Sequence, residues 1–208
     1  MKENSVTPRK QPSQDRSKEK VKRILEATIR LLEKSGVESI TAIKVAKEAG
    51  VAVASFYQYF PNKSAVIYTL YQQFLGTVLE RMDKLEKEKY LKITWPEFFL
   101  ELSNHLLEIP CFSEKADEQL SRAMEFFPDL QPLETKHANN VALRLAQYLK
   151  GYGCRWQETE LLDLGLYLYR ASNSLFSVSI GEKNDQQERF LSWSREVLMA
   201  LVAKCFDD

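Results

Sequence analysis

Residues 41–63 read T-A-I-K-V-A-K-E-A-G-V-A-V-A-S-F-Y-Q-Y-F-P-N-K. Gly50 lies near the middle of this stretch, and glycine is the residue that adopts a positive φ at the least cost. Pro61 cannot continue a helix, whereas Asn62 directly after it is a good helix N-cap. The stretch therefore predicts two short helices joined by a glycine turn, followed by the capped start of a third helix.

The first short helix is opened by Ser39 or Thr41, which are both good N-cap residues, and it runs to Ala49. We expect Ile43, Ala46 and Ala49 to face inward. The alanine side chains are small, so a neighbouring helix can pack closely against this face.

The second short helix covers residues 52–60 and carries Phe56 and Phe60 four positions apart. This spacing places both rings on one face, where we expect them to anchor the helix in the core. The opposite face begins with small residues, which would let the start of the helix lie deep in the major groove of DNA. That outward face carries Val53, Ala54, Ser55, Tyr57, Gln58 and Tyr59.

The distribution of charge separates the front of the chain from the rest. The 208 residues carry no net formal charge, yet residues 1–63 contain 13 Lys and Arg against 7 Asp and Glu, a formal charge of +6. The remaining residues carry −6. This asymmetry favours an anionic polymer as the partner of the front alone. Residues 1–14 are polar and contain two prolines, so we expect a disordered basic arm.

Beyond these short helices, the chain reads as a series of amphipathic helices. Only 7 Gly and 7 Pro occur in 208 residues, and apolar residues recur at helical spacing, which predicts an all-α fold. Helices are expected over residues 15–35, 64–88, 94–108, 113–127, 132–150, 157–180 and 185–206. We predict a three-helix helix-turn-helix domain over residues 15–70 and a larger helical bundle over residues 71–208.

The run G-V-A-V-A-S-F-Y-Q-Y-F-P-N-K, with the long helix before it, resembles the DNA-binding domain of the TetR family of bacterial repressors. The usual wording of that family is close to G-V-S-x-G-T-L-Y-x-H/Y-F-x-N/S-K-E, and the resemblance covers residues 20–70. Four positions depart from it: Ala52, Val53, Ala54 and Ser64 stand where serine, lysine, glycine and glutamate are common. The side chains of Val53 and Ala54 cannot form hydrogen bonds, which favours apolar contact with thymine methyl groups over guanine readout.

The resemblance implies roles for individual residues. Thr41 would contact a phosphate from the start of the first short helix, and Lys44 matches a variable position that sometimes reaches DNA. Tyr57, Tyr59 and Lys63 match phosphate or base contacts, although packing within the domain is an alternative for the two tyrosines. The predicted DNA-binding residues are Thr41, Lys44, Val53, Ala54, Ser55, Tyr57, Gln58, Tyr59 and Lys63.

Residues 161–171, L-L-D-L-G-L-Y-L-Y-R-A, are apolar on nearly every side of a helix, so they need cover on more than one face. The last helix carries two apolar stripes. Two such helices from each of two chains would form a four-helix interface, which the TetR resemblance also implies. A buried central helix in a monomer is the alternative. The predicted dimer contacts are Leu164, Leu168, Phe190, Val197 and Leu201.

The resemblance also implies an effector site in the C-terminal part of the chain, which is rich in aromatic residues. An apolar lining with a few polar groups suits a small hydrophobic molecule, although aromatic stripes more often form the core. The predicted lining consists of Phe99, Leu102, His105, Phe126, Tyr167, Asn173 and Phe176.

The sequence contains no recognisable catalytic or metal-binding motif. The two histidines lie in different predicted helices, and the three cysteines are too far apart to suggest zinc or a disulfide framework. We therefore expect neither an enzyme nor a cofactor. No stretch of about 18 apolar residues could cross a membrane, and the N-terminus does not resemble a signal peptide, so a cytoplasmic protein is expected.

These features predict a homodimeric repressor that binds a palindromic operator in double-stranded DNA and is released by a small hydrophobic ligand. Its two recognition helices would lie about 34 Å apart, which is one turn of DNA. Two other hypotheses remain. One is a DNA-binding regulator without a small ligand, controlled by a protein partner. The other is an enzyme or carrier with an incidental helix-turn-helix.

Overall fold

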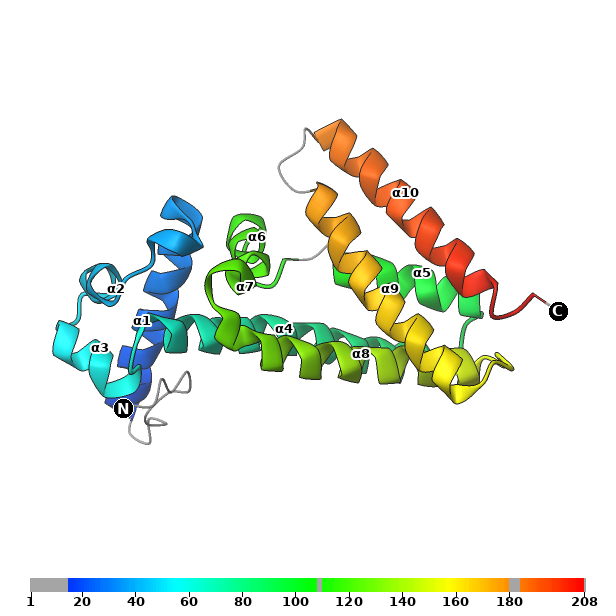
Figure 1. Cartoon of the computed structure of the whole chain (residues 1–208), viewed down its shortest axis with the longest axis horizontal. Helices are drawn as coiled ribbons and strands as arrows, with labels where there is room; N and C mark the ends of the chain where they lie inside the picture. The colour runs from blue at the N-terminus through cyan, green and yellow to red at the C-terminus, as the bar shows by residue number, and fades with distance from the viewer. Residues whose placement is uncertain (1–14, 108–109, 180–183, 208) are drawn as a thin grey trace. The chain divides into compact units, whose positions relative to one another are not determined.

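The computed structural model describes residues 15–107, 110–179 and 184–207 (Figure 1). The predicted arm of residues 1–14 lies outside this range. All regular secondary structure in the described residues is helical, which confirms the all-α prediction. Within these ranges, ten α-helices occur in the order α1 (Asp15–Ser35), α2 (Ala42–Ala49), α3 (Val53–Tyr59), α4 (Lys63–Lys89), α5 (Trp95–Leu107), α6 (Glu114–Ser121), α7 (Ala123–Phe126), α8 (Gln131–Gly151), α9 (Glu158–Ser179) and α10 (Asn184–Ala203). Two 3-10 helices, η1 (Val37–Ser39) and η2 (Pro128–Leu130), lie between them.

The helix predicted over residues 113–127 is interrupted. Arg122 adopts φ −82° and ψ −7°, and its backbone N–H donates to the carbonyl oxygens of Glu118 and Leu120. These dihedral angles lie away from the α-helical minimum, so α6 ends at Ser121 and the short α7 begins at Ala123.

The described residues form two compact units. The first contains the residues up to Gly76 together with Pro110–Leu133, and the second contains residues 77–107, 134–179 and 184–207. The first unit therefore includes α6, α7 and η2, which lie within residues 71–208, the range of the predicted helical bundle. The boundary at Gly76 falls within α4.

The core of the first unit is built from the inward faces of α1, α2, α3 and the start of α4. Ile24 and Leu32 of α1, Val45 of α2, and Phe56 of α3 are fully buried there. This cluster continues into Leu120 and Ala123, which are also fully buried. Burial of this apolar surface is the main stabilising contribution to the unit.

Polar contacts also join residues 110–133 to the front of the chain. The side chain of Gln119 accepts a hydrogen bond from the backbone N–H of Val37 at 3.0 Å. The hydroxyl of Ser113 donates to Glu33 of α1 at 2.6 Å and also caps α6. Because Gln119 is 9% exposed, its amide oxygen supplies the partner that the Val37 N–H would otherwise lack.

The second unit packs α5, α8, α9 and α10 around the end of α4. An aromatic cluster of Tyr90, Phe98, Tyr148 and Tyr152 fills one region, with ring centroids 5.0–5.6 Å apart. At the start of α5, Glu97 accepts hydrogen bonds from both the backbone N–H and the hydroxyl of Thr94, which forms one half of a capping box. Helices α9 and α10 lie side by side and antiparallel (Figure 1).

Gly165 allows α9 to approach α8 closely. A Cβ atom at this position would lie 2.5 Å from the carbonyl oxygen of Ala142 and 3.0 Å from its Cα. Those are backbone atoms, so they cannot move aside as a flexible side chain could. No described helix combines the length and the apolar character that crossing a bilayer requires.

We expect Gly165→Ala to lower the free energy of unfolding by about 1–3 kcal/mol, because the added methyl group forces the two helices apart. Gly76→Ala is the matched control, since a Cβ there meets no atom within 4 Å. It should stabilise its helix by about 0.5–1 kcal/mol through the higher helix propensity of alanine. Urea unfolding at a fixed protein concentration measures both changes. Equal stability of the two variants would contradict the close approach.

Candidate nucleic-acid interface

The helix-turn-helix is set up by local backbone geometry. The side chain of Thr41 accepts a hydrogen bond from the backbone N–H of Lys44 at 3.2 Å, so Thr41 is the N-cap of α2. Gly50 adopts φ 62° and ψ 39°, the left-handed conformation expected for it. The N–H of Val51 then donates to the carbonyl of Ala46 at 3.0 Å, which closes the turn.

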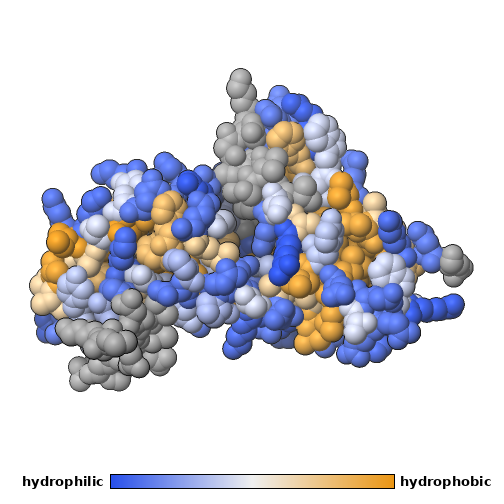
Figure 2. Space-filling model, viewed as in Figure 1, coloured by the Kyte–Doolittle hydropathy of each residue, from blue (hydrophilic) through white to orange (hydrophobic). Residues whose placement is uncertain are grey.

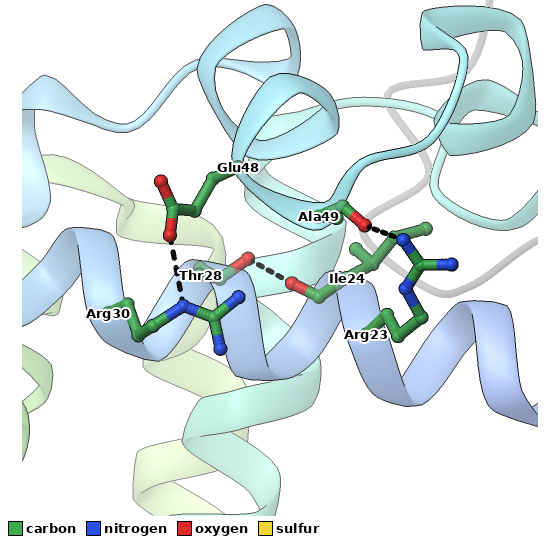
Figure 3. Close-up of polar contacts among 6 residues, drawn as sticks. All are labelled: Arg23, Ile24, Thr28, Arg30, Glu48 and Ala49. Atoms are coloured by element: carbon green, nitrogen blue, oxygen red, sulfur yellow. Dashed lines mark hydrogen bonds and ion pairs between the residues drawn. The ribbon is translucent and has the colours of Figure 1, made fainter.

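Arg23 of α1 stabilises the end of α2. Its guanidinium donates to the carbonyl oxygen of Ala49 at 2.6 Å and to that of Gly50 at 3.2 Å (Figure 3). A cation at a helix C-terminus also interacts favourably with the helix dipole. About two turns further along α1, Arg30 forms a surface ion pair with Glu48 at 3.0 Å. The two arginines therefore connect α1 to α2 on either side of the buried Thr28.

Helix α3 has a buried face and an exposed face. Phe56 and Phe60 are 0% and 1% exposed, and their ring centroids lie 5.7 Å apart. Both are core anchors as predicted. Tyr57 is 42% exposed on the other side, and its ring packs edge-on against Phe56. The core therefore fixes which residues of α3 are available to a partner.

The predicted DNA-binding residues of α3 do not all lie on the exposed face. Tyr59 is 7% exposed and belongs to the core cluster, so little of its side chain is accessible. Ser55 is half-buried. The exposed positions are Val53, Ala54, Tyr57 and Gln58.

Two lysines lie at the starts of helices near this face. Lys63 is exposed and begins α4, where Asn62 acts as the predicted cap by accepting a hydrogen bond from the N–H of Ala65 at 2.9 Å. The Lys63 ammonium lies 5.4 Å from the ring centroid of Phe127. Lys44 is exposed on α2, and its ammonium donates to the carbonyl of Ser39 at 3.1 Å. Free N–H groups at a helix N-terminus together with a lysine can bind a phosphate.

The prediction that Ile43 faces inward is wrong. Ile43 is 66% exposed, because the buried stripe of α2 consists of Ala42, Val45, Ala46 and Ala49. These residues have the i, i+3, i+4, i+7 spacing of a helix face. The spacing was present in the sequence, but three of the four residues are alanines and give a weak hydrophobic signal. Arg23 was also missed, since nothing in its sequence context marks its hydrogen bonds to α2.

The predicted effector residues differ in their burial and in the unit to which they belong. Phe99 and Leu102 are buried in the core of the second unit, and His105 is half-buried with its Nδ1 atom 3.0 Å from the carbonyl oxygen of Glu101. In contrast, Tyr167 is 59% exposed and Asn173 is exposed. Phe126 belongs to the first unit and is 39% exposed, and the side chain of Phe176 lies outside the described part.

A buried polar group between α8 and α9 was not predicted. The hydroxyl of Tyr169 donates to Glu134 at 2.6 Å, and the ring of His137 packs edge-on against Tyr169. His137 is 4% exposed, and burial lowers the pKa of its imidazole, so the neutral form is favoured. Within the described residues, its Nε2 atom has no hydrogen-bond partner.

The cysteines and the possible metal ligands of the described residues form no further candidate functional site. Cys154 and Cys205 are free and buried, and their side chains interact although they are far apart in sequence. Burial raises the pKa of the Cys205 thiol to about 12, so the unreactive thiol form predominates at neutral pH. No group of three or more possible metal ligands occurs in the parts of the chain that the structure describes.

An open hollow of about 540 Å³ lies on the first unit. Its wall includes the ion pair of Arg30 and Glu48, and none of the predicted effector residues contributes to it. The lining is formed by Arg30, Leu31, Glu33, Lys34, Glu48 and Lys115. So polar a surface does not suit a small hydrophobic molecule.

The predicted dimer residues differ in their exposure. Leu168 is 5% exposed and lies in the core of its own chain, while Leu164 and Leu201 are half-buried against that core. Phe190 is half-buried, with its ring centroid 5.8 Å from that of Trp193. Val197 is 50% exposed. Tyr167 on α9, which was predicted to line the effector site, is 59% exposed, and Trp193 on α10, which was not predicted, is 55% exposed.

A short helix, a left-handed glycine turn and a second helix with an exposed face together define a helix-turn-helix domain. Residues 24–68 match the sequence model of the family described as "Bacterial regulatory proteins, tetR family". The helix-turn-helix of this protein is thus a TetR-family domain, which confirms the resemblance seen in the sequence.

Individual relatives agree with this assignment. The chain is 34% identical over 70 residues to the fatty acid metabolism regulator protein of Bacillus subtilis, covering 34% of this chain and 36% of the relative. It is 39% identical over 75 residues to the transcriptional repressor KstR of Rhodococcus jostii, covering 36% of this chain and 34% of the relative. The matched segment therefore spans about a third of the length of these relatives.

Solved structures extend the similarity of fold to most of the chain. A transcriptional regulator from a Rhodococcus species aligns with a TM-score of 0.70 and 17% identity, covering 88% of this chain and 96% of that one. The fatty acid degradation regulator FadR of Bacillus halodurans aligns with a TM-score of 0.65 and 20% identity, covering 93% and 97%. Because the two sequence identities are 17% and 20%, these alignments establish similarity of fold alone.

Replacing Arg23 with alanine should lower the free energy of unfolding by about 1–2 kcal/mol, because two carbonyl groups at the end of α2 lose a charged donor. Arg30→Ala is the matched control on the same helix, and loss of its surface ion pair should cost only about 0.5 kcal/mol. Urea unfolding measures both variants. If the two changes destabilise the protein equally, Arg23 has no special role in holding the turn.

Proposed function

We propose that this protein is a transcriptional regulator that binds double-stranded operator DNA through α2 and α3. The observation that carries this proposal is the exposed face of α3, which the buried Phe56 and Phe60 hold outward in a domain of the TetR family. The formal charge of +6 on residues 1–63 provides the electrostatic attraction to phosphate that DNA binding requires. Acting on bacterial DNA would place the protein in the cytoplasm.

The proposed DNA contacts divide into two kinds. Thr41, Lys44 and Lys63 lie at or next to helix N-termini and would contact phosphates, which position the protein without reading sequence. Val53, Ala54, Tyr57 and Gln58 are exposed on α3 and would face the base edges. Ser55 and Tyr59 are less accessible, and their contribution would be smaller.

The functional unit would be a homodimer. Each chain contains one such domain, so a palindromic operator is matched by a protein with two-fold symmetry. The exposed apolar residues Tyr167, Trp193 and Val197 lie on α9 and α10, which pack against each other. Large exposed aromatic residues are typical of protein interfaces, so we propose this pair of helices as the contact between chains.

Regulation by a small hydrophobic ligand, with release from the operator, is the mode of control we favour. The name of a repressor, KstR, among the relatives and the aromatic core of the second unit support it. Ligand and operator would then weaken each other's binding by the same factor. A protein partner in place of the ligand is the alternative mode. The relatives are regulators of transcription, which disfavours the hypothesis of an enzyme or carrier.

Binding to a selected operator duplex should weaken steeply with salt, because bound phosphates release counterions. Lys63→Ala should weaken binding to every duplex alike and reduce the slope of log K against log salt by about 1. Fluorescence anisotropy over a salt series measures this slope. Lys150→Ala, an exposed lysine of α8, is the control that should leave it unchanged. A protein that selects no duplex at low salt is not a DNA-binding regulator.

Replacing both Trp193 and Val197 with glutamate should convert the dimer into a monomer, because four buried charges would face one another across the two-fold axis. Operator affinity should fall by at least ten-fold. Light scattering coupled to size exclusion measures the mass. Leu100→Glu alters an exposed leucine on α5 of the second unit and should leave the dimer intact. A wild-type chain that binds the operator as a monomer would contradict the proposed interface.

A further inference from the structure

Ile43 is the most exposed large hydrophobic side chain in the described part of the chain, at 66%. The core does not require it, because α2 is buried through Ala42, Val45, Ala46 and Ala49. An isoleucine held in water at the start of a short helix contributes little to folding, since its apolar surface stays exposed.

Exposed apolar residues are concentrated in the helix-turn-helix. The described residues of the first unit expose four large hydrophobic side chains, and three of them are Ile43, Val53 and Tyr57. The fourth, Phe126, lies outside this motif. Figure 2 shows hydrophobic residues at the surface where α2 and α3 lie. Single exposed hydrophobic residues need no explanation, but three within 15 residues of a DNA-binding motif do.

The surroundings of Ile43 suit a nucleic-acid partner. It is the second residue of α2, two positions after the Thr41 cap and directly before the exposed Lys44. Side chains of a helix point toward its N-terminus, so Ile43 projects toward the positive end of the α2 dipole. Phosphates are attracted to that end, which would bring a DNA groove beside the isoleucine.

The major groove presents one apolar group, the C5-methyl group of thymine. We infer that Ile43 reads a thymine methyl group in the operator, and that Val53 of α3 reads another. Ile43 is thereby a specificity-determining residue, and the operator carries thymine at the positions that the two residues contact. This inference rests on the proposed function, because it requires that α2 and α3 bind operator DNA.

Uracil in place of thymine removes the methyl group and leaves every hydrogen-bonding group of the base pair unchanged. The operator is first selected from random duplexes by the full-length protein. Each thymine is then replaced singly by uracil, and affinity is measured by fluorescence anisotropy at one salt concentration. We expect a loss of about three- to five-fold at each contacted thymine, the value for removing one buried methyl group.

Variants assign each methyl group to a side chain. Ile43→Ala should bind the thymine operator about three- to ten-fold more weakly and should no longer distinguish thymine from uracil at one position. Val53→Ala should lose discrimination at a different position. Leu100→Ala, an equally apolar exposed residue of the second unit, should behave as the wild type. Ile43 is exposed, so its variant should unfold at the wild-type temperature, which a thermal scan checks.

The outcomes separate this inference from the proposed function. If no duplex is enriched above random sequence, the proposed function fails. If an operator is selected but the wild type binds its uracil forms as tightly as thymine, the proposed function stands and methyl readout is overturned. If Ile43→Ala keeps the full wild-type preference for thymine at every position, Ile43 is not a specificity residue.

Discussion

The burial of Phe56 and Phe60 is the constraint on which the DNA-binding surface depends. Helix α3 has only seven residues, too few to be stable alone, so packing rather than propensity holds it. With both rings in the core, the rotation of the helix is fixed and its opposite side faces outward. The angle between α2 and α3 is then set by Gly50 in the left-handed conformation and by Arg23, which binds the last carbonyl groups of α2.

The first unit is not one continuous piece of chain. Residues 110–133 return to it and supply part of its core through Leu120 and Ala123. Gln119 supplies the partner of a buried backbone N–H, and the ring of Phe127 lies beneath the ammonium of Lys63, a proposed phosphate contact. A change in the position of this segment would therefore act directly on α1, η1 and the start of α4.

The second unit contains polar side chains in its interior and large apolar side chains on its surface. Inside it, Tyr169 donates a hydrogen bond to Glu134 and packs edge-on against the buried His137, whereas Trp193 and Val197 remain exposed on α10. Both features run against the usual partition of side chains, and such exceptions are more informative than the core itself. The helices that carry the polar side chains, α8 and α9, approach each other closely at Gly165.

Most helices, the caps at Thr41, Asn62 and Thr94, and the glycine turn followed from the sequence alone, because each depends on residues within a few positions of one another. The family of the helix-turn-helix could also be recognised from one short run of consecutive residues. Only the tertiary structure showed that Ile43 faces outward, that Tyr59 is buried, and that residues 110–133 join the first unit. It also showed that the predicted effector residues differ in burial and put His137 beside Tyr169. These outcomes depend on contacts between residues far apart in the chain, and helical periodicity does not specify which faces will meet.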